Sequence, residues 1–156
     1  ILAAARNRLK NWRDVACLRH QIHDRLNDDT KRNDAPQYFS PQAAIGAMRE
    51  ALNNNLNTPE ALSIIDESFS SISQRPLDAI YRTGLVELLQ TIDDALGLQL
   101  LDSTPDINDD AKQLLVERRR ARDNKNWVRS DELRDQLKTL GIIMRDTAYD
   151  TIWTYA

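Results

Sequence analysis

Apolar residues recur at helical spacing along most of the chain, and this periodicity is the feature that most constrains its fold. Spacings of three and four residues bring such side chains onto one face of an α-helix. Only four Gly and five Pro interrupt the 156 residues, and no alternating strand pattern occurs before residue 140. We therefore expect a mainly α chain, an antiparallel helical bundle followed by a small helix-helix-β-hairpin appendage.

The bundle is predicted to contain four amphipathic helices. The first runs from about residue 2 to 27, and Ser40-Pro41 provides an N-cap and first-turn proline for the second. Thr58-Pro59-Glu60 repeats this start signal for the third helix, while Gly97 suits the left-handed residue that closes the fourth. The expected buried positions are Leu2, Leu9, Trp12, Ala16, Ile22, Leu26, Ile45, Met48, Leu52, Leu62, Ile65, Phe69, Ile72, Leu77, Ile80, Leu85, Leu88, Leu89, Ile92 and Leu96.

The rest of the chain changes in character. Asn108 is predicted to open a fifth helix, and Asn126 to cap a sixth helix that Gly141 ends. Residues 142–144 and 151–155 are rich in strand formers and flank a turn around 148–150, so they predict a hairpin packed on these two helices. The expected domains are a bundle at 1–97, a linker at 98–107 and a small domain at 108–156.

Composition narrows the possible chemistry. Cys17 is the single cysteine and the chain has two His, so neither an internal disulfide nor a four-ligand zinc cluster is expected. No run of about 18 apolar residues occurs, and no leader is recognised, so a cytoplasmic location without a membrane partner is expected. Because the chain starts at Ile1, we expect it to be part of a longer polypeptide.

Charge is distributed unevenly. The net charge is −3, yet residues 117–134 contain seven basic and four acidic side chains, a local +3 within an otherwise acidic chain. Such a local concentration matters more to a phosphate-binding surface than the net value does. The basic residues expected to hold a phosphate backbone are Arg118, Arg119, Lys125 and Arg129.

One stripe of the sixth helix suggests binding of an unpaired nucleotide. At about 100° per residue, Trp127, Asp131 and Arg134 fall within roughly 60°, whereas Leu133, Leu137 and Leu140 cluster elsewhere. Trp can stack on a base, Arg can bond a guanine edge or a phosphate, and Asp can accept from amino groups.

Spacing alone leaves a structural alternative open. Trp127 would then be a core anchor, Asp131 and Arg134 an ordinary surface pair three residues apart, and residues 118–122 a solvated face.

Two motifs resemble those of one family. Residues 51–62, ALNNNLNTPEAL, resemble the helical-domain signature ALxDDDxNTPEAL of cysteinyl-tRNA synthetases, and Ala95-Leu96-Gly97-Leu98 follows at a fitting distance. Residues 118–147 are similar to the family's C-terminal pattern RxARxxKDWxxADxIRDxLxxxGIxLxDT, and Thr151-Ile152-Trp153 follows. The resemblance covers about residues 39–156.

The resemblance implies a C-terminal region that grips the anticodon loop of cysteine tRNA. Arg122, Trp127, Asp131 and Arg134 would read the anticodon. Cysteine tRNA is then the expected partner of a monomeric chain that positions it for a class I cysteine–tRNA ligase. The family's turn usually contains a proline and a glycine where this chain has Ala148 and Asp150, so its geometry is expected to differ.

The resemblance does not extend to catalytic motifs. His-x-Gly-His, Lys-Met-Ser-Lys-Ser and the zinc ligands of the family do not occur. We therefore expect neither catalysis nor a cofactor in this chain, with ATP and zinc implied only for an upstream catalytic domain. Two alternatives are a freestanding non-catalytic paralogue acting as an RNA- or protein-interaction module, and the helical part of a ligase joining cysteine to a sugar-amine.

Overall fold

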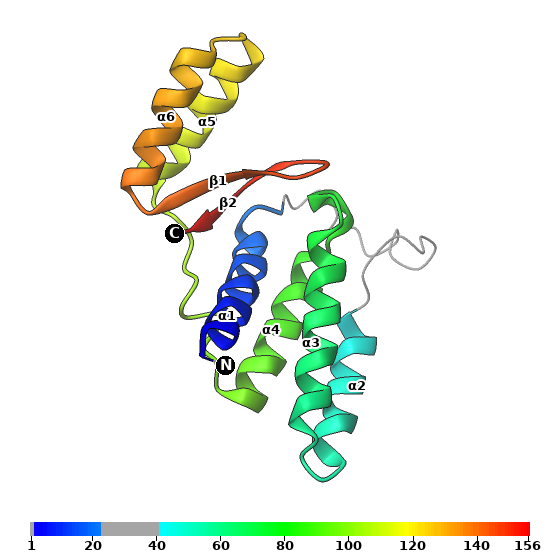
Figure 1. Cartoon of the computed structure of the whole chain (residues 1–156). Helices are drawn as coiled ribbons and strands as arrows, with labels where there is room; N and C mark the ends of the chain where they lie inside the picture. Colours follow the sequence, from blue (N-terminus) through cyan, green and yellow to red (C-terminus); the bar gives the residue numbers. More distant parts are fainter. Residues whose placement is uncertain (1, 23–40) are drawn as a thin grey trace. The chain divides into compact units, whose positions relative to one another are not determined.

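The computed structural model describes residues 2–22 and 41–156, and the chain divides into two compact units, Ile1–Thr104 and Pro105–Ala156. The described residues form six α-helices and one two-stranded antiparallel sheet. This confirms the predicted fold class, mainly helical with a C-terminal hairpin (Figure 1). The first helix, predicted to run to about residue 27, ends instead at Cys17 and is followed by a 3-10 turn at Leu18–His20. Its predicted part beyond residue 22 and the Ser40 cap lie outside the described residues.

The first unit consists of four helices whose apolar faces meet. Contacts join α2 to both α3 and α4, and α1 to α3; Figure 1 shows these helices running alongside one another. The elements are α1 (Leu2–Cys17), the 3-10 turn η1 (Leu18–His20), α2 (Pro41–Asn53), α3 (Thr58–Ser73), the 3-10 turn η4 (Leu77–Ala79) and α4 (Arg82–Leu96).

An aromatic pair joins α1 to α3 in this core. The rings of Trp12 and Phe69 meet edge to face with centroids 5.9 Å apart, and the indole Nε1 of Trp12 donates to Asp66 over 2.7 Å. This bond satisfies the one polar atom of a buried tryptophan. Leu2, predicted to share the buried face, is instead 65% exposed at the helix start.

Two predicted helix starts are wrong in position. The fourth helix begins at Arg82 rather than Leu77, because Ile80 and Tyr81 have extended backbones that separate η4 from α4. Ile80 is nevertheless buried, so the apolar spacing continued across a break in the helix. The third helix is capped by Asn57 rather than Thr58: the Asn57 side chain accepts from the Glu60 backbone N–H and donates to its carboxylate.

Residues 98–104 belong to the first unit. Leu100 and Thr104 are fully buried, and the carboxylate of Asp93 accepts from the backbone N–H groups of Leu100 and Leu101. The buried guanidinium of Arg19 donates to the Thr104 hydroxyl at 2.7 Å and to the Thr104 carbonyl at 2.7 Å. Part of the segment expected to be a linker therefore packs as core.

The second unit follows the predicted order closely. It contains α5 (Asp109–Asp123), α6 (Trp127–Thr139), β1 (Ile142–Asp146) and β2 (Thr151–Tyr155). The caps predicted at Asn108 and Asn126 are confirmed, since each side chain accepts from the backbone N–H three residues later. Gly97 and Gly141 have the left-handed backbone expected of residues after a helix.

The hairpin packs against α6 as predicted, and its contact with α5 is an ion pair between Arg122 and Asp146. Its register pairs Ile142 with Tyr155 and Asp146 with Thr151, and β1 contacts α6. Ile142, Ile152 and Trp153 are buried within this unit, and the Tyr155 hydroxyl donates to the Pro105 carbonyl over 2.7 Å. A two-stranded sheet, marginal by itself, thus shares a core with the helices.

Asn57→Ala tests the corrected helix start. The change should lower the free energy of unfolding by about 1 kcal/mol, because it leaves the Glu60 N–H without its capping oxygen. Thr58→Ala should cost clearly less, since the Thr58 hydroxyl bonds only the Leu56 carbonyl. Urea unfolding followed by helical circular dichroism measures both; a larger loss for Thr58→Ala would contradict the assignment.

Candidate nucleic-acid interface

The rotation of α6 is set by two leucines. Leu133 and Leu137 are fully buried, so the opposite side of the helix faces solvent. Leu140, predicted to share their face, is 52% exposed because it follows the last helical residue as the C-cap. The predicted stripe of Trp127, Asp131 and Arg134 consequently lies on the outer side, where all three side chains are exposed.

Trp127 stands out among the exposed residues. The first residue of α6, it is 58% exposed, and the neighbouring Val128 is 74% exposed. The interpretation of Trp127 as a core anchor is therefore wrong. A large exposed aromatic side chain on the outer side of a helix is suited to stacking against a base.

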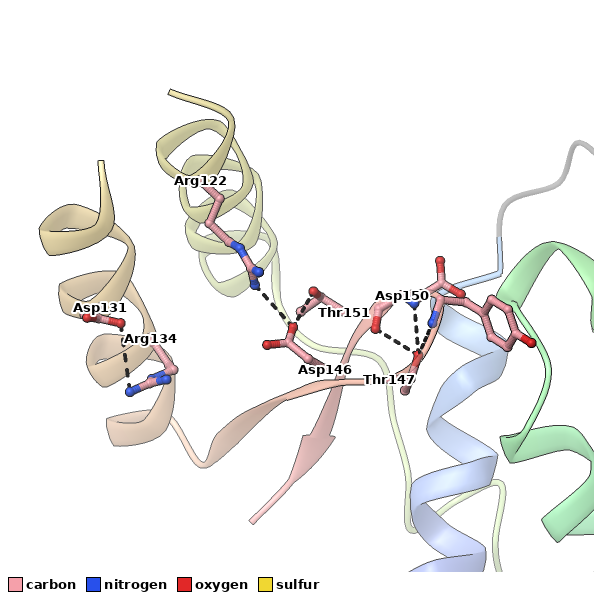
Figure 2. Close-up of polar contacts among 8 residues, drawn as sticks. Arg122, Asp131, Arg134, Asp146, Thr147, Asp150 and Thr151 are labelled. Atoms are coloured by element: carbon pink, nitrogen blue, oxygen red, sulfur yellow. Dashed lines mark hydrogen bonds and ion pairs between the residues drawn. The ribbon is translucent and has the colours of Figure 1, made fainter. Parts of the chain in front are cut away.

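Asp131 and Arg134 lie one helical turn apart on α6. Their ion pair is long, 3.9 Å between Arg134 Nη2 and Asp131 Oδ1, and both groups are more than half exposed. Figure 2 shows the two side chains extending from α6. Such an exposed pair contributes little to stability, so both groups can exchange it for other partners at small cost.

The connection between α5 and α6 presents Lys125 next to Trp127. Lys125 has a left-handed backbone with φ of 56°, and the N–H groups of Lys125 and Asn126 return to the carbonyls of Arg122 and Ala121. These two bonds close α5 in the usual pattern for a helix ended by a left-handed residue. The lysine side chain is exposed at this turn.

The basic residues of α5 and α6 differ in their surroundings. Arg119 is exposed, whereas Arg129 pairs with Glu117 at 3.3 Å and with Glu132 at 3.2 Å. Arg118 is only 7% exposed, so the interpretation of residues 118–122 as one solvated face is wrong for this residue. The Arg118 side chain turns inward because it lies on the side of α5 that packs against α6.

Arg122 is joined to the hairpin by a contact that the sequence did not reveal. Its Nη1 lies 3.2 Å from Asp146 Oδ1, and the Thr151 hydroxyl donates to the same oxygen over 2.6 Å (Figure 2). The Thr151 bond, followed by Arg122, lowers the pKa of Asp146 below its usual value. The only signal for this contact would have been the hairpin register, which places Asp146 opposite Thr151.

The hairpin turn is held by Thr147. Its hydroxyl accepts from the N–H of Asp150 at 2.9 Å and donates to the carbonyl of Asp150 at 2.9 Å; these bonds are visible in Figure 2. A threonine that bonds the backbone three residues on makes a tight turn without proline or glycine. The turn thus closes despite Ala148 and Asp150.

The described residues include neither a candidate metal site nor a helix that could span a membrane. Residues 2–22 and 41–156 contain no group of three or more His, Cys, Asp or Glu side chains able to hold a metal ion. None of their helices has the length and apolar character needed to cross a membrane.

Comparison with known proteins points to one family. Residues 104–153 match the cysteinyl-tRNA ligase anticodon-binding domain. A cysteine–tRNA ligase of Histophilus somni strain 2336 is 30% identical over 98% of this chain and 36% of its own length. One from Francisella tularensis strain SCHU S4 is 33% identical over 67% of the chain and 24% of its own length. The chain thus spans about a third or less of these relatives.

Thr151→Val tests the contact beneath Arg122. The β-branched valine preserves the strand but removes the hydroxyl donor, so the pKa of Asp146 should rise toward its usual value. Because its folded pKa is depressed, ionised Asp146 contributes stability above its unfolded pKa, and this contribution is lost as the pH falls through the folded pKa. Carboxyl NMR titration measures the shift; an unchanged pKa would show that Thr151 does not stabilise the ionised form.

Proposed function

Residues 104–153 belong to the cysteinyl-tRNA ligase anticodon-binding family, and from this premise we propose that the second unit binds the anticodon loop of cysteine tRNA. The observation that carries the proposal is the exposure of Trp127 on a helix whose other side is fully buried. An anticodon is an unpaired segment, and unpaired bases are bound by stacking on aromatic side chains and by bonds to their exposed edges.

Each exposed group would have a distinct task. Trp127 offers the stacking surface, while Asp131 accepts from an amino group and Arg134 donates to a base edge or phosphate. Arg122 would act beside them, with its direction set by Asp146. Because the Asp131–Arg134 pair is long and exposed, its members can turn to RNA with little loss.

Phosphate contacts would come from the surrounding cations. Arg119 and Lys125 are exposed, and Arg129 could add to them by giving up surface pairs worth little individually. Lysine occupies a left-handed position at 125 where glycine would be less strained. Retaining a long cation there is consistent with a role in binding.

The parent protein is, in this proposal, a class I cysteine–tRNA ligase. This chain would position the tRNA without catalysing a reaction, and ATP and zinc would belong to a catalytic domain encoded elsewhere in the polypeptide. No residue of the described ranges is assigned to either cofactor. The compact first unit would support the binding unit rather than read the RNA itself.

Anticodon dependence tests the proposed function directly. The full chain should bind cysteine tRNA more tightly than the same tRNA with a changed anticodon, and the affinity should fall steeply with salt because phosphate contacts release counterions. Fluorescence anisotropy across a salt series measures both. Equal binding of the two tRNAs would contradict anticodon reading and favour a general RNA- or protein-interaction module.

Trp127→Ala tests the stacking surface. Binding of cysteine tRNA should weaken by roughly 1–3 kcal/mol, because one base loses its aromatic partner, while the thermal stability should change little for so exposed a residue. Leu140→Ala is the matched control, since Leu140 is an exposed apolar side chain at the other end of α6. Equal losses in both variants, or none in either, would contradict base stacking on Trp127.

A further inference from the structure

Arg118 is a largely buried cation without an ion-pair partner among the described residues. Its side chain on α5 is 7% exposed, and its Nε atom is shut off from solvent without a hydrogen-bond partner. Within residues 2–22 and 41–156, no carboxylate lies within ion-pair distance of it. Buried polar atoms are nearly always bonded in folded proteins, so an exception requires an explanation.

The charges around Arg118 are those of the proposed reading surface. Arg122 and Arg134 oppose its positive charge, while Asp146 and Asp131 favour it. The two carboxylates are already engaged, Asp146 by Arg122 and Thr151 and Asp131 loosely by Arg134. Burial is the largest influence and lowers the pKa of Arg118 below its usual value, although a guanidinium stays charged at neutral pH.

Such an arrangement destabilises the free unit. A cation removed from water loses hydration, and only close pairing with an anion restores that loss. The neighbours of Arg118 are two cations and two carboxylates that already have other partners, so the protein restores only part of this loss. The missing anion would have to come from outside.

We propose that Arg118 is a largely buried cation without an ion-pair partner beneath the surface formed by Arg122, Asp131, Arg134 and Asp146, and that bound RNA compensates its charge. This inference rests on the proposed function and adds a residue that acts without touching a base. Because the residue is only 7% exposed, Arg118 would act mainly through its field on a phosphate group at the surface, where the low local dielectric strengthens the attraction. It is therefore a positioning residue that strengthens RNA binding at the expense of stability.

Arg118→Met separates this role from a structural one. Methionine keeps the unbranched apolar stem and helix propensity but removes the charge. Amide hydrogen exchange in α5 and α6 of the free full chain should slow by about tenfold, because an unpaired buried charge is gone. Affinity for cysteine tRNA should fall by about tenfold, as expected for loss of one charge-assisted interaction. A merely structural arginine would instead make exchange faster.

Two control variants complete the test. Arg118→Lys retains a cation and should retain most of the affinity without slowing exchange. Arg119→Met removes an exposed neighbouring cation. The slope of log affinity against log salt concentration should become shallower by the amount expected for about one phosphate contact, and amide exchange should stay unchanged.

The outcomes distinguish this inference from the proposed function. Faster exchange or unfolding of the Arg118→Met chain, or unchanged RNA affinity while Trp127→Ala weakens binding, would overturn the role of Arg118 alone. Absence of any anticodon preference in the wild-type chain would overturn the proposed function and this inference with it.

Discussion

The burial of Leu133 and Leu137 on one side of α6 is the constraint on which the proposed binding surface depends. Once these two side chains are in the core, the rotation of the helix about its axis is set, and the stripe of Trp127, Asp131 and Arg134 is left on the solvent side. Trp127 therefore faces solvent although it is among the largest apolar residues of the chain. The hairpin completes this core through Ile142, Ile152 and Trp153.

Charge in the basic segment is distributed more selectively than a count of arginines indicates. Arg129 is paired with two glutamates and Arg122 with Asp146, so these groups are oriented before any ligand arrives. Arg118 is buried without such a pair. The second unit thus combines exposed cations, cations held in position and one largely buried cation without an ion-pair partner, and this combination suits a polyanion better than a uniformly solvated helix face would.

Local signals were predicted well because local forces produce them. Asn108 and Asn126 cap their helices, Gly97 and Gly141 follow helix ends, and the strands flank the expected turn. Each of these depends on a few neighbouring residues and their backbone preferences. The predictions that are wrong depend on packing. The apolar spacing places Leu77 and Ile80 in the fourth helix, but Leu77 lies in a 3-10 turn and Ile80 is buried from an extended segment. Leu140 is predicted to be in the core, but it lies past the last turn of α6.

The sequence by itself determined the helical class, the hairpin and the membership of residues 104–153 in their family. It also determined the stripe containing Trp127, Asp131 and Arg134. Periodicity and motif spacing are properties of one segment at a time, so they can be read without the tertiary structure. Only the tertiary structure decided that Trp127 is exposed, that Arg118 is buried and that Asp146 meets Arg122. These outcomes depend on which side of α5 faces α6 and β1, and no single segment contains that information. Burial and charge pairing arise where segments distant in sequence exclude water between them.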